Sequence, residues 1–321
     1  MEFKHLTAYA AVVRRNSFSK AAEELYLSQP TVSMYIRQLE EELNTVLLVR
    51  TTKSLEITPK GREVYEYALN ILSMKEKLLR NCGENGGDII SIGASTVPSA
   101  YLLPEVLASY RKKNSRIQFA VDQGDSRLIL KKLKDGLYDL GVIGMDPGDD
   151  QLSAIPFFLD TIVITTPCEE RFRKLKEADC TDPSEGALVL RELLSEPMIL
   201  REEGSASKYA VDLFLKQAGV PESSLNVTAR INDPEAIKNM VAKGIGSAIM
   251  SVRAADNYEK QGLLLTFPFP GEGCHRSFYL VQRKDGLLTE RVQEFSRFLL
   301  EYYKSVSESS GHVKAQVQIG I

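Results

Sequence analysis

A short segment near the N-terminus carries side chains whose types and order suit contact with DNA bases. In S-Q-P-T-V-S, Ser28 can cap a helix, and Pro30 in the first turn lacks only an N–H group that is unpaired there anyway. Gln29 could bind adenine through two hydrogen bonds, Thr31 could touch a thymine methyl group, and Ser33 could bond to a base or a phosphate. The segment therefore predicts a helix whose first turn enters the major groove of DNA.

Basic side chains near this segment could bind the DNA backbone. Arg37, one turn further along the helix, could reach guanine or phosphate, whereas Arg50 and Lys53 could bind phosphates, which add affinity but no sequence information. The first 58 residues nevertheless hold as many acidic as basic side chains, and the formal net charge of the chain is −3. Bulk charge therefore does not predict a nucleic-acid partner, and a DNA-binding face would need charges sorted between faces.

The composition is that of an ordinary globular protein. The 321 residues are 43% hydrophobic and 26% charged, which suits two or three domains. No apolar run approaches the roughly 18 residues that span a bilayer, and no secretory signal is visible, so we expect a cytoplasmic protein without a membrane partner. The four cysteines and three histidines are scattered, so we expect no metal site.

The apolar spacing around the S-Q-P-T-V-S segment predicts a winged helix-turn-helix. We expect a helix over 3–14, a second helix capped by Ser19, a third helix that starts after Ser28 and ends before Asn44, and two short strands within 47–58. Asn44 suits the end of the third helix because asparagine tolerates the left-handed backbone conformation. Thr58 is the expected cap of a long helix over about 59–80.

The long helix carries an apolar stripe without an obvious partner. Its members recur at helical spacing, interrupted by Lys75, and are Tyr65, Ala68, Leu72 and Leu79. Pairing with the same helix of a second chain would bury the stripe, and the alternative is that the helix folds against its own domain. Residues 81–88 are polar and rich in glycine, which indicates a linker.

From residue 89 onwards, strand and helix patterns alternate. The expected strands are 89–93, 117–122, 140–143, 162–166, 198–200, 227–229, 246–250 and 277–281, and the expected helices are 98–113, 126–135, 169–178, 206–217, 234–243 and 289–304. This order predicts an α/β fold with mostly parallel sheets. We expect two lobes with a ligand between them, one formed by about 88–160 with 268–304 and the other by about 161–267, followed by a tail over 305–321.

Three expected helix starts carry hydroxyl groups or an arginine that could bind an anion. They are Ser95-Thr96-Val97, the segment from Arg201 through Gly204 to Ser205, and Asn232-Asp233-Pro234. Free N–H groups at a helix start favour an anion, and Arg201 could hold a carboxylate or another oxyanion through two hydrogen bonds. The segment 123–126 could close the other side with Ser126, although Asp125 would repel an anion unless it points away. The alternative at each start is a simple helix cap.

Four motifs of the chain together match one family. They are S-F-S-K-A-A-E-E-L, S-Q-P-T-V-S, I-R-Q-L-E-E-E-L, and T-P-K-G at 58–61. With them, residues 1 to about 300 resemble the LysR-type transcriptional regulators. Asn44 replaces the usual glycine of that family and Leu48 the usual phenylalanine, and neither is an expected DNA contact. The resemblance implies a winged helix-turn-helix over 1–58, a linker helix and hinge over 59–87, and an effector domain over 88–304 similar to periplasmic binding proteins.

The same resemblance implies how the protein works. It implies a regulator that binds double-stranded promoter DNA, forms a homodimer through the long helix and a homotetramer from two dimers, and contacts RNA polymerase. It also implies a small-molecule effector in the cleft, where family members commonly use the positions of Ser95, Thr96 and Ser205. From the residues and the resemblance together, we expect an anionic effector bound by Ser95, Thr96, Val97, Ser126, Arg201, Gly204 and Ser205.

Two other classes of function are alternatives. An enzyme on an α/β scaffold would show a nucleophile elbow, a P-loop, a dinucleotide fingerprint or a histidine–carboxylate cluster, and the sequence has none of these. We therefore expect neither catalysis nor a bound cofactor. His275 beside Cys274 is an adjacent base and nucleophile, but neighbours on a strand face opposite sides. A solute-binding protein with a fused helical module would need the secretory signal that is missing.

Overall fold

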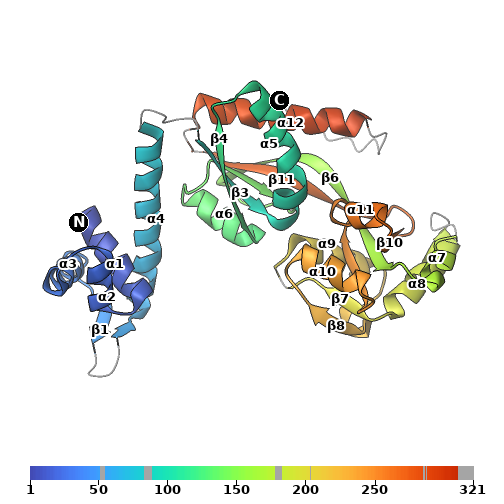
Figure 1. Cartoon of the computed structure of the whole chain (residues 1–321), viewed down its shortest axis with the longest axis horizontal. Coiled ribbons are helices and arrows are strands. Elements are labelled where there is room, and N and C mark those ends of the chain that lie inside the picture. The colour runs from blue at the N-terminus through green and yellow to red at the C-terminus, as the bar shows by residue number, and fades with distance from the viewer. Residues whose placement is uncertain are drawn as a thin grey trace. The chain divides into compact units, whose positions relative to one another are not determined.

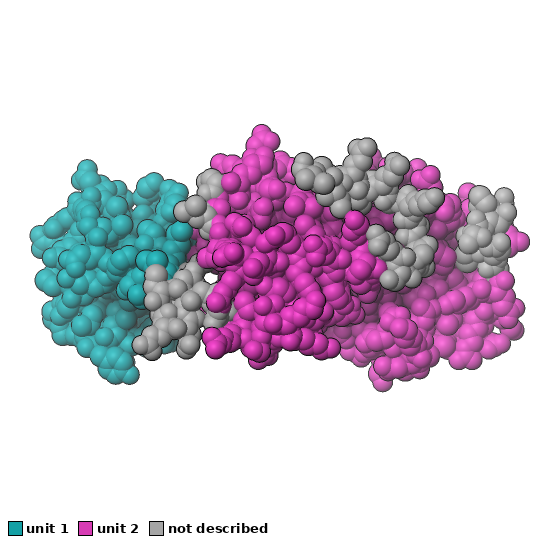
Figure 2. All heavy atoms as spheres, turned by 90° about the horizontal axis from the view of Figure 1, so that it is seen from above, with its two compact units in different colours: residues 1–87 teal, residues 88–321 magenta. Residues whose placement is uncertain are grey.

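The chain divides into two compact units, Met1–Gly87 and Asp88–Ile321, which we call the N-terminal and the C-terminal unit (Figures 1 and 2). The computed structural model describes residues 1–50, 55–82, 89–177, 183–202, 204–284, 286 and 288–309. Lys53, the expected linker beyond Cys82 and the expected tail beyond Ser309 lie outside these residues.

The N-terminal unit consists of helices around one apolar core and a short hairpin. Its elements are α1 (Phe3–Arg15), α2 (Phe18–Glu24), α3 (Gln29–Glu42), β1 (Leu48–Arg50), β2 (Leu55–Ile57) and α4 (Pro59–Cys82). Tyr9 of α1 packs with Val32 and Leu39 of α3 in this core, because apolar side chains repeat at helical spacing on both helices. The strands pair antiparallel, with Leu48 opposite Ile57. The expected winged helix-turn-helix is therefore confirmed.

The helix ends in this unit mostly follow the expected residues. Asn44 adopts the left-handed conformation with a φ of 48°, and the Oγ1 of Thr58 accepts a backbone hydrogen bond from the first turn of α4 at 2.8 Å. The expected cap at Ser19 is wrong. Ser17 caps α2, because its backbone is still extended and its Oγ accepts a hydrogen bond from the N–H of Lys20 at 3.3 Å.

Part of the apolar stripe of α4 packs against its own unit, and the rest is exposed to solvent. Ala68 is fully buried, and Tyr65 and Leu72 pack against the core of the N-terminal unit. These three side chains therefore pack within their own domain, as the alternative predicts, although Tyr65 and Leu72 stay partly exposed. Leu79 is 61% exposed, and other apolar side chains of α4 that are also exposed are Tyr67, Met74 and Leu78.

The C-terminal unit is a twisted sheet covered by helices (Figure 1). Its strands are β3 (Ile89–Ser95), β4 (Gln118–Gly124), β5 (Leu140–Ile143), β6 (Leu152–Pro167), β7 (Met198–Leu200), β8 (Val227–Arg230), β9 (Ser247–Ser251), β10 (Leu264–Pro268) and β11 (Cys274–Arg283). Its helices are the π-helix η1 (Pro98–Leu102), α5 (Leu103–Lys113), α6 (Ser126–Lys134), α7 (Glu170–Leu175), α8 (Pro183–Ser195), α9 (Ala206–Gln217), the 3-10 helix η2 (Glu222–Ser224), α10 (Pro234–Ala242), α11 (Val252–Lys260) and α12 (Glu290–Ser309).

The sheet is mixed, so the α/β class is confirmed but the expected mostly parallel arrangement is wrong. The strand order is β4-β3-β5-β11-β6-β9-β7-β8, with β10 paired to β6. β3 runs parallel to β4 and β5, and β7 runs parallel to β8 and β9. β11 is antiparallel to β5 and β6, and β6 is antiparallel to β9. The mixed directions arise because β11, from the end of the chain, inserts between β5 and β6 and runs antiparallel to both.

Several elements differ from the expected ones. No expected element corresponds to α8, α11 or β10. The strands β6 and β11 are longer than the strands expected over 162–166 and 277–281. The last helix was expected to end near residue 304, and this is wrong, because α12 continues to Ser309. Asp160 lies inside β6 and Arg276 inside β11, and each charge interrupts the apolar pattern that marks a strand. Both strands therefore reach further than hydrophobicity indicates.

Four clusters of buried apolar side chains lie in the described part of the C-terminal unit, and the two largest form the cores of two lobes. Phe295 belongs to the core of lobe 1 and Leu200 to the core of lobe 2. β6 and β11 contribute to both cores, and Figure 1 shows these two strands running from one group of helices to the other. The residue limits of the lobes, 88–160 with 268–304 and 161–267, stay predictions.

Candidate functional site

The first turn of α3 presents the side chains expected to contact DNA. The Oγ of Ser28 caps the helix by accepting a hydrogen bond from the N–H of Thr31 at 3.2 Å. The Nε2 of Gln29 donates to the Oγ of Ser33 at 3.2 Å. Ser28, Gln29 and Pro30 are exposed, and Thr31 and Ser33 are partly exposed, because the opposite face of α3 is buried in the core. The structure thus places these five residues together on an accessible helix end.

Arg37 lies one turn further along α3 and is bound only loosely. Its Nε donates to the Oε1 of Glu41 at 2.8 Å, and the Arg37 side chain is 81% exposed. Such an exposed ion pair contributes about 0–1 kcal/mol, so a phosphate can replace it. Arg50 ends β1 of the hairpin, while its side chain and Lys53 lie outside the described atoms.

Two exposed side chains near α3 are absent from the expected set. Tyr26 is 96% exposed in the turn before α3, with a φ of 55°, and Met34 on α3 is 48% exposed. A left-handed conformation is unusual for a residue other than glycine. From the apolar spacing, Tyr26 is only a residue of a turn and Met34 only a residue of a helix. The sequence gives no sign that either side chain is exposed.

Four helix starts of the C-terminal unit meet at one cavity of about 480 Å³. The starts are those of η1, α6, α9 and α10, and the expected ligand residues in the cavity wall are Ser95, Thr96, Val97, Ser126, Arg201 and Ser205. Gly204 is not among the residues that line the cavity, and its part in ligand binding stays a prediction. Its φ of +87° favours glycine, which indicates a role in the turn before α9.

The alternative role of helix cap applies to some of these groups and not to others. Asp125 caps α6 and Asp233 caps α10, each by accepting a backbone hydrogen bond, at 2.8 and 3.0 Å. Ser205 makes no such bond to α9, and its Oγ donates instead to the Oγ of Ser207 at 3.3 Å. The first N–H groups of α9 therefore lie at the cavity without a side-chain cap.

Arg201 occupies the cavity wall with one nitrogen unpaired. Its Nη2 donates to the Oδ1 of Asn232 at 3.0 Å, while its Nε is buried without a hydrogen-bond partner among the described residues. Burial, together with the nearby charge of Arg276, lowers the pKa of Arg201 to about 10. Arg201 still carries its charge at neutral pH, and a bound anion would stabilise it.

Arg276 of β11 is a cavity residue that is absent from the expected set. Its Nε donates to the Oδ2 of Asp160 at 2.9 Å, and its Nη1 donates to the Oγ of Ser207 at 3.1 Å. Its Nη2 is buried without a partner among the described residues. A signal was present, because Cys274, Arg276 and Phe278 alternate on one buried face of the strand. A charge in such an apolar series marks a paired or functional group.

Ser126 adds a third unpaired group to the same cavity. Its side chain is buried, and its Oγ has no hydrogen-bond partner among the described residues. Buried polar groups without a hydrogen-bond partner are rare in folded proteins. The nitrogen atoms of Arg201 and Arg276 can only donate, so together with Ser126 they suit a ligand rich in acceptor oxygens.

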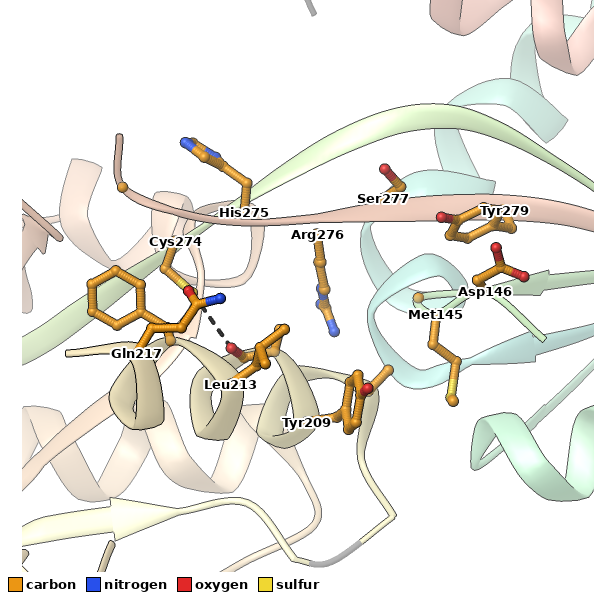
Figure 3. A pocket seen from close by; sticks show the side chains of 15 residues that line it. Met145, Asp146, Tyr209, Leu213, Gln217, Cys274, His275, Arg276, Ser277 and Tyr279 are labelled. Atoms are coloured by element: carbon orange, nitrogen blue, oxygen red, sulfur yellow. Dashed lines mark hydrogen bonds between the residues drawn. The ribbon is translucent and has the colours of Figure 1, made fainter. Parts of the chain in front are cut away.

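Arg276 also lines a second, neighbouring cavity of about 360 Å³ (Figure 3). Figure 3 shows the Arg276 side chain extending from β11 towards α9, with Tyr209 and Leu213 of that helix beside it. Cys274 and His275 line the same cavity, but Cys274 is buried and His275 is exposed. They point to opposite sides of β11, so they do not form a nucleophile–base pair.

Within the described ranges, no group of three or more His, Cys, Asp and Glu side chains could hold a metal ion. None of the helices described is both long enough and apolar enough to span a membrane.

Comparison with known proteins agrees with this geometry. The family model of the LysR substrate binding domain matches residues 84–304, and that of the bacterial regulatory helix-turn-helix protein of the lysR family matches residues 3–62. A RuBisCO operon transcriptional regulator of Allochromatium vinosum is 29% identical, over 94% of this chain and 96% of that protein. The matched relatives are transcriptional regulators, not enzymes.

Solved structures share the fold. Full-length CbnR complexed with its target DNA has a TM-score of 0.73 at 18% identity, covering 95% of this chain and 99% of that one. The effector binding domain of QuiR in complex with shikimate has a TM-score of 0.57 at 18% identity, covering 68% of this chain and 97% of that one. With both domain models matched along its length, the chain belongs to the LysR family of transcriptional regulators.

Proposed function

We propose that this regulator recognises a promoter sequence through the first turn of α3 and is switched by a small anionic effector in the 480 Å³ cavity. One observation carries the effector proposal: Arg201 and Arg276 both line this cavity, and each has a buried nitrogen without a hydrogen-bond partner among the described residues. A buried charge without a full set of partners is costly, and an anion would supply the missing acceptors. QuiR, whose effector domain was solved with shikimate, a carboxylate at neutral pH, lends support.

A chain of contacts could transmit binding from the cavity to the strands that join the lobes. Arg276 lies in β11, and its partner Asp160 lies in β6. Asp160 also accepts a hydrogen bond at 2.6 Å from the Oγ of Ser251, which ends β9. An anion that draws Arg276 towards itself would pull on β11 directly and on β6 through Asp160. We infer that this contact chain biases the relative position of the lobes.

The assembly belongs to the same proposal. The exposed apolar side chains of α4 favour a homodimer through this helix, with two dimers forming a homotetramer. CbnR was solved with its target DNA, and the corresponding partner here is double-stranded promoter DNA. Contact with RNA polymerase and action in the cytoplasm complete the proposal.

Gln29→Ala is expected to reduce discrimination between promoter and unrelated DNA by roughly 10- to 100-fold, because a bidentate base contact is worth about 1–3 kcal/mol. Arg50→Ala should weaken binding to all DNA about equally and lower the salt slope by about 1. Titrations of both duplexes at several salt concentrations measure these effects. Equal loss of specificity in the two variants would show that α3 does not read bases.

The double variant Ser95→Ala, Ser205→Ala is expected to bind promoter DNA as the wild type does and to lose its response to the effector. Neither hydroxyl caps a helix, so the fold should tolerate both changes. A thermal-shift screen of small anions identifies a ligand, since selective binding to the folded state raises the midpoint. Gel shifts with and without that anion then measure the response, and an unchanged response would place the effector elsewhere.

A further inference from the structure

The cavity that we propose as the effector site carries two kinds of charge at different depths. The guanidinium groups belong to residues that are almost completely buried, Arg201 at 7% and Arg276 at 9% exposure of the whole residue. The carboxylates in the wall belong to Asp125, Glu202 and Asp233, which are all exposed. Donors for an anion thus lie deep in the cavity, and negative charges lie towards solvent.

The buried guanidinium groups of Arg201 and Arg276 favour a ligand with one anionic group. The Nε of Arg201 and the Nη2 of Arg276, which have no partner among the described residues, can only donate, and the start of α9 lines the same cavity. One carboxylate or comparable oxyanion can accept from these donors together. A cavity of about 480 Å³ is larger than an inorganic oxyanion needs and lies in the range of sites for small organic molecules.

The outer carboxylates disfavour a second anionic group and suit a cation. Asp125 and Asp233 each use Oδ1 to cap a helix, and neither makes a hydrogen bond through Oδ2 to the part of the chain that is described. The negative charges of Asp233 and Glu202 raise the pKa of Arg201, and all three residues line the same cavity. A ligand with opposite charges on neighbouring atoms matches this pattern, whereas a dianion meets repulsion at the rim.

We propose, on the basis of the effector site above, that its ligand is bipolar: a small organic molecule whose carboxylate binds Arg201 and Arg276 and whose ammonium group faces Asp233 and Asp125. α-Amino acids and their side-chain derivatives are the simplest class with this pattern. The hydroxyl of Ser126 remains available for a polar group of the ligand.

Matched pairs of ligands test this proposal on the full chain. Each common L-α-amino acid is compared with the carboxylic acid that lacks its amino group, at equal concentration and ionic strength, by thermal shift and then calorimetry. At least one amino acid should raise the unfolding midpoint, and its partner acid should bind at least about tenfold more weakly, which corresponds to about 1.4 kcal/mol.

Variants separate the two ends of the site. Asp233→Asn and Asp125→Asn remove a charge but keep a side chain that caps helices well, so the fold should persist. Each should weaken the amino acid about two- to fivefold, the range of an exposed ion pair, and leave the partner acid unchanged or tighter. Arg201→Gln should weaken both ligands. Asp256→Asn, which removes an exposed carboxylate outside the cavity, is the control and should change neither.

The outcomes distinguish this inference from the proposed function. If simple anions raise the midpoint and no amino acid does, the bipolar ligand is wrong and the anion site stands. If an amino acid and its partner acid bind equally well, the ammonium contact is likewise refuted. If neither class binds, both proposals for the cavity fall, while promoter binding by α3 is judged by the DNA titrations alone.

Discussion

Asp160→Ala is expected to lower the free energy of unfolding of the C-terminal unit by about 3–5 kcal/mol. The side chain of Asp160 is fully buried and that of Arg276 is 6% exposed, so the substitution leaves a guanidinium charge in the interior without its carboxylate. The hydrogen bond from Ser251 is lost as well. Because the chain has no tryptophan, circular dichroism and hydrogen exchange are the suitable probes.

Two comparisons make this prediction specific. Asp256→Ala breaks the exposed ion pair with Lys260 and should change stability by less than about 1 kcal/mol. The double variant Asp160→Ala, Arg276→Met should be more stable than Asp160→Ala, because no buried charge remains unpaired. If Asp160→Ala were as stable as Asp256→Ala, the buried pair would not hold the crossing strands.

Gly61→Ala is expected to destabilise the N-terminal unit by about 2–3 kcal/mol. A Cβ atom at this position would lie 2.3 Å from the carbonyl oxygen of Leu47 and 2.9 Å from the hydroxyl of Tyr9, so the start of α4 would have to move away from the hairpin. That shift would also stretch the hydrogen bond from the Tyr9 hydroxyl to the Gly61 carbonyl, now 2.7 Å. Hydrogen exchange of α1 and α4 measures the loss.

The neighbouring residue provides the control for this substitution. Lys60→Ala removes only an exposed ion pair with Glu63 and should change stability by less than about 1 kcal/mol. Promoter affinity should fall with Gly61→Ala in proportion to the unfolded fraction of the N-terminal unit. Equal exchange rates in both variants would mean that α4 can start elsewhere without strain.

Local sequence patterns were sufficient to predict most helices of the N-terminal unit. Helical spacing and capping residues predicted α1, α3 and α4 close to their observed ends, and the exposed first turn of α3 follows from Ser28 and the buried face opposite it. The misplaced cap of α2 shows the limit of this reasoning. Ser17 and Ser19 are equally good caps by type, and only the extended backbone at Ser17 separates them.

Contacts between distant parts of the chain decided the packing of α4 and the strand directions of the sheet, which the sequence left open. The apolar stripe of α4 required a partner, but nothing local could tell that Tyr65 and Ala68 pack on their own unit. In the same way, the mixed strand directions depend on the insertion of β11 between β5 and β6, which lie more than 100 residues earlier in the chain.

The sequence by itself determined the family of this protein, the helix expected to read DNA and the helix starts that could hold an anion, because these depend on residue types close together in the chain. Only the tertiary structure brought four helix starts to one cavity and added Arg276 to it. Arg276 and Asp160 are 116 residues apart, and each interrupts the apolar pattern of its strand when considered alone. Their pairing becomes visible only when β6 and β11 lie side by side, since a buried charge is stable where its partner is buried with it.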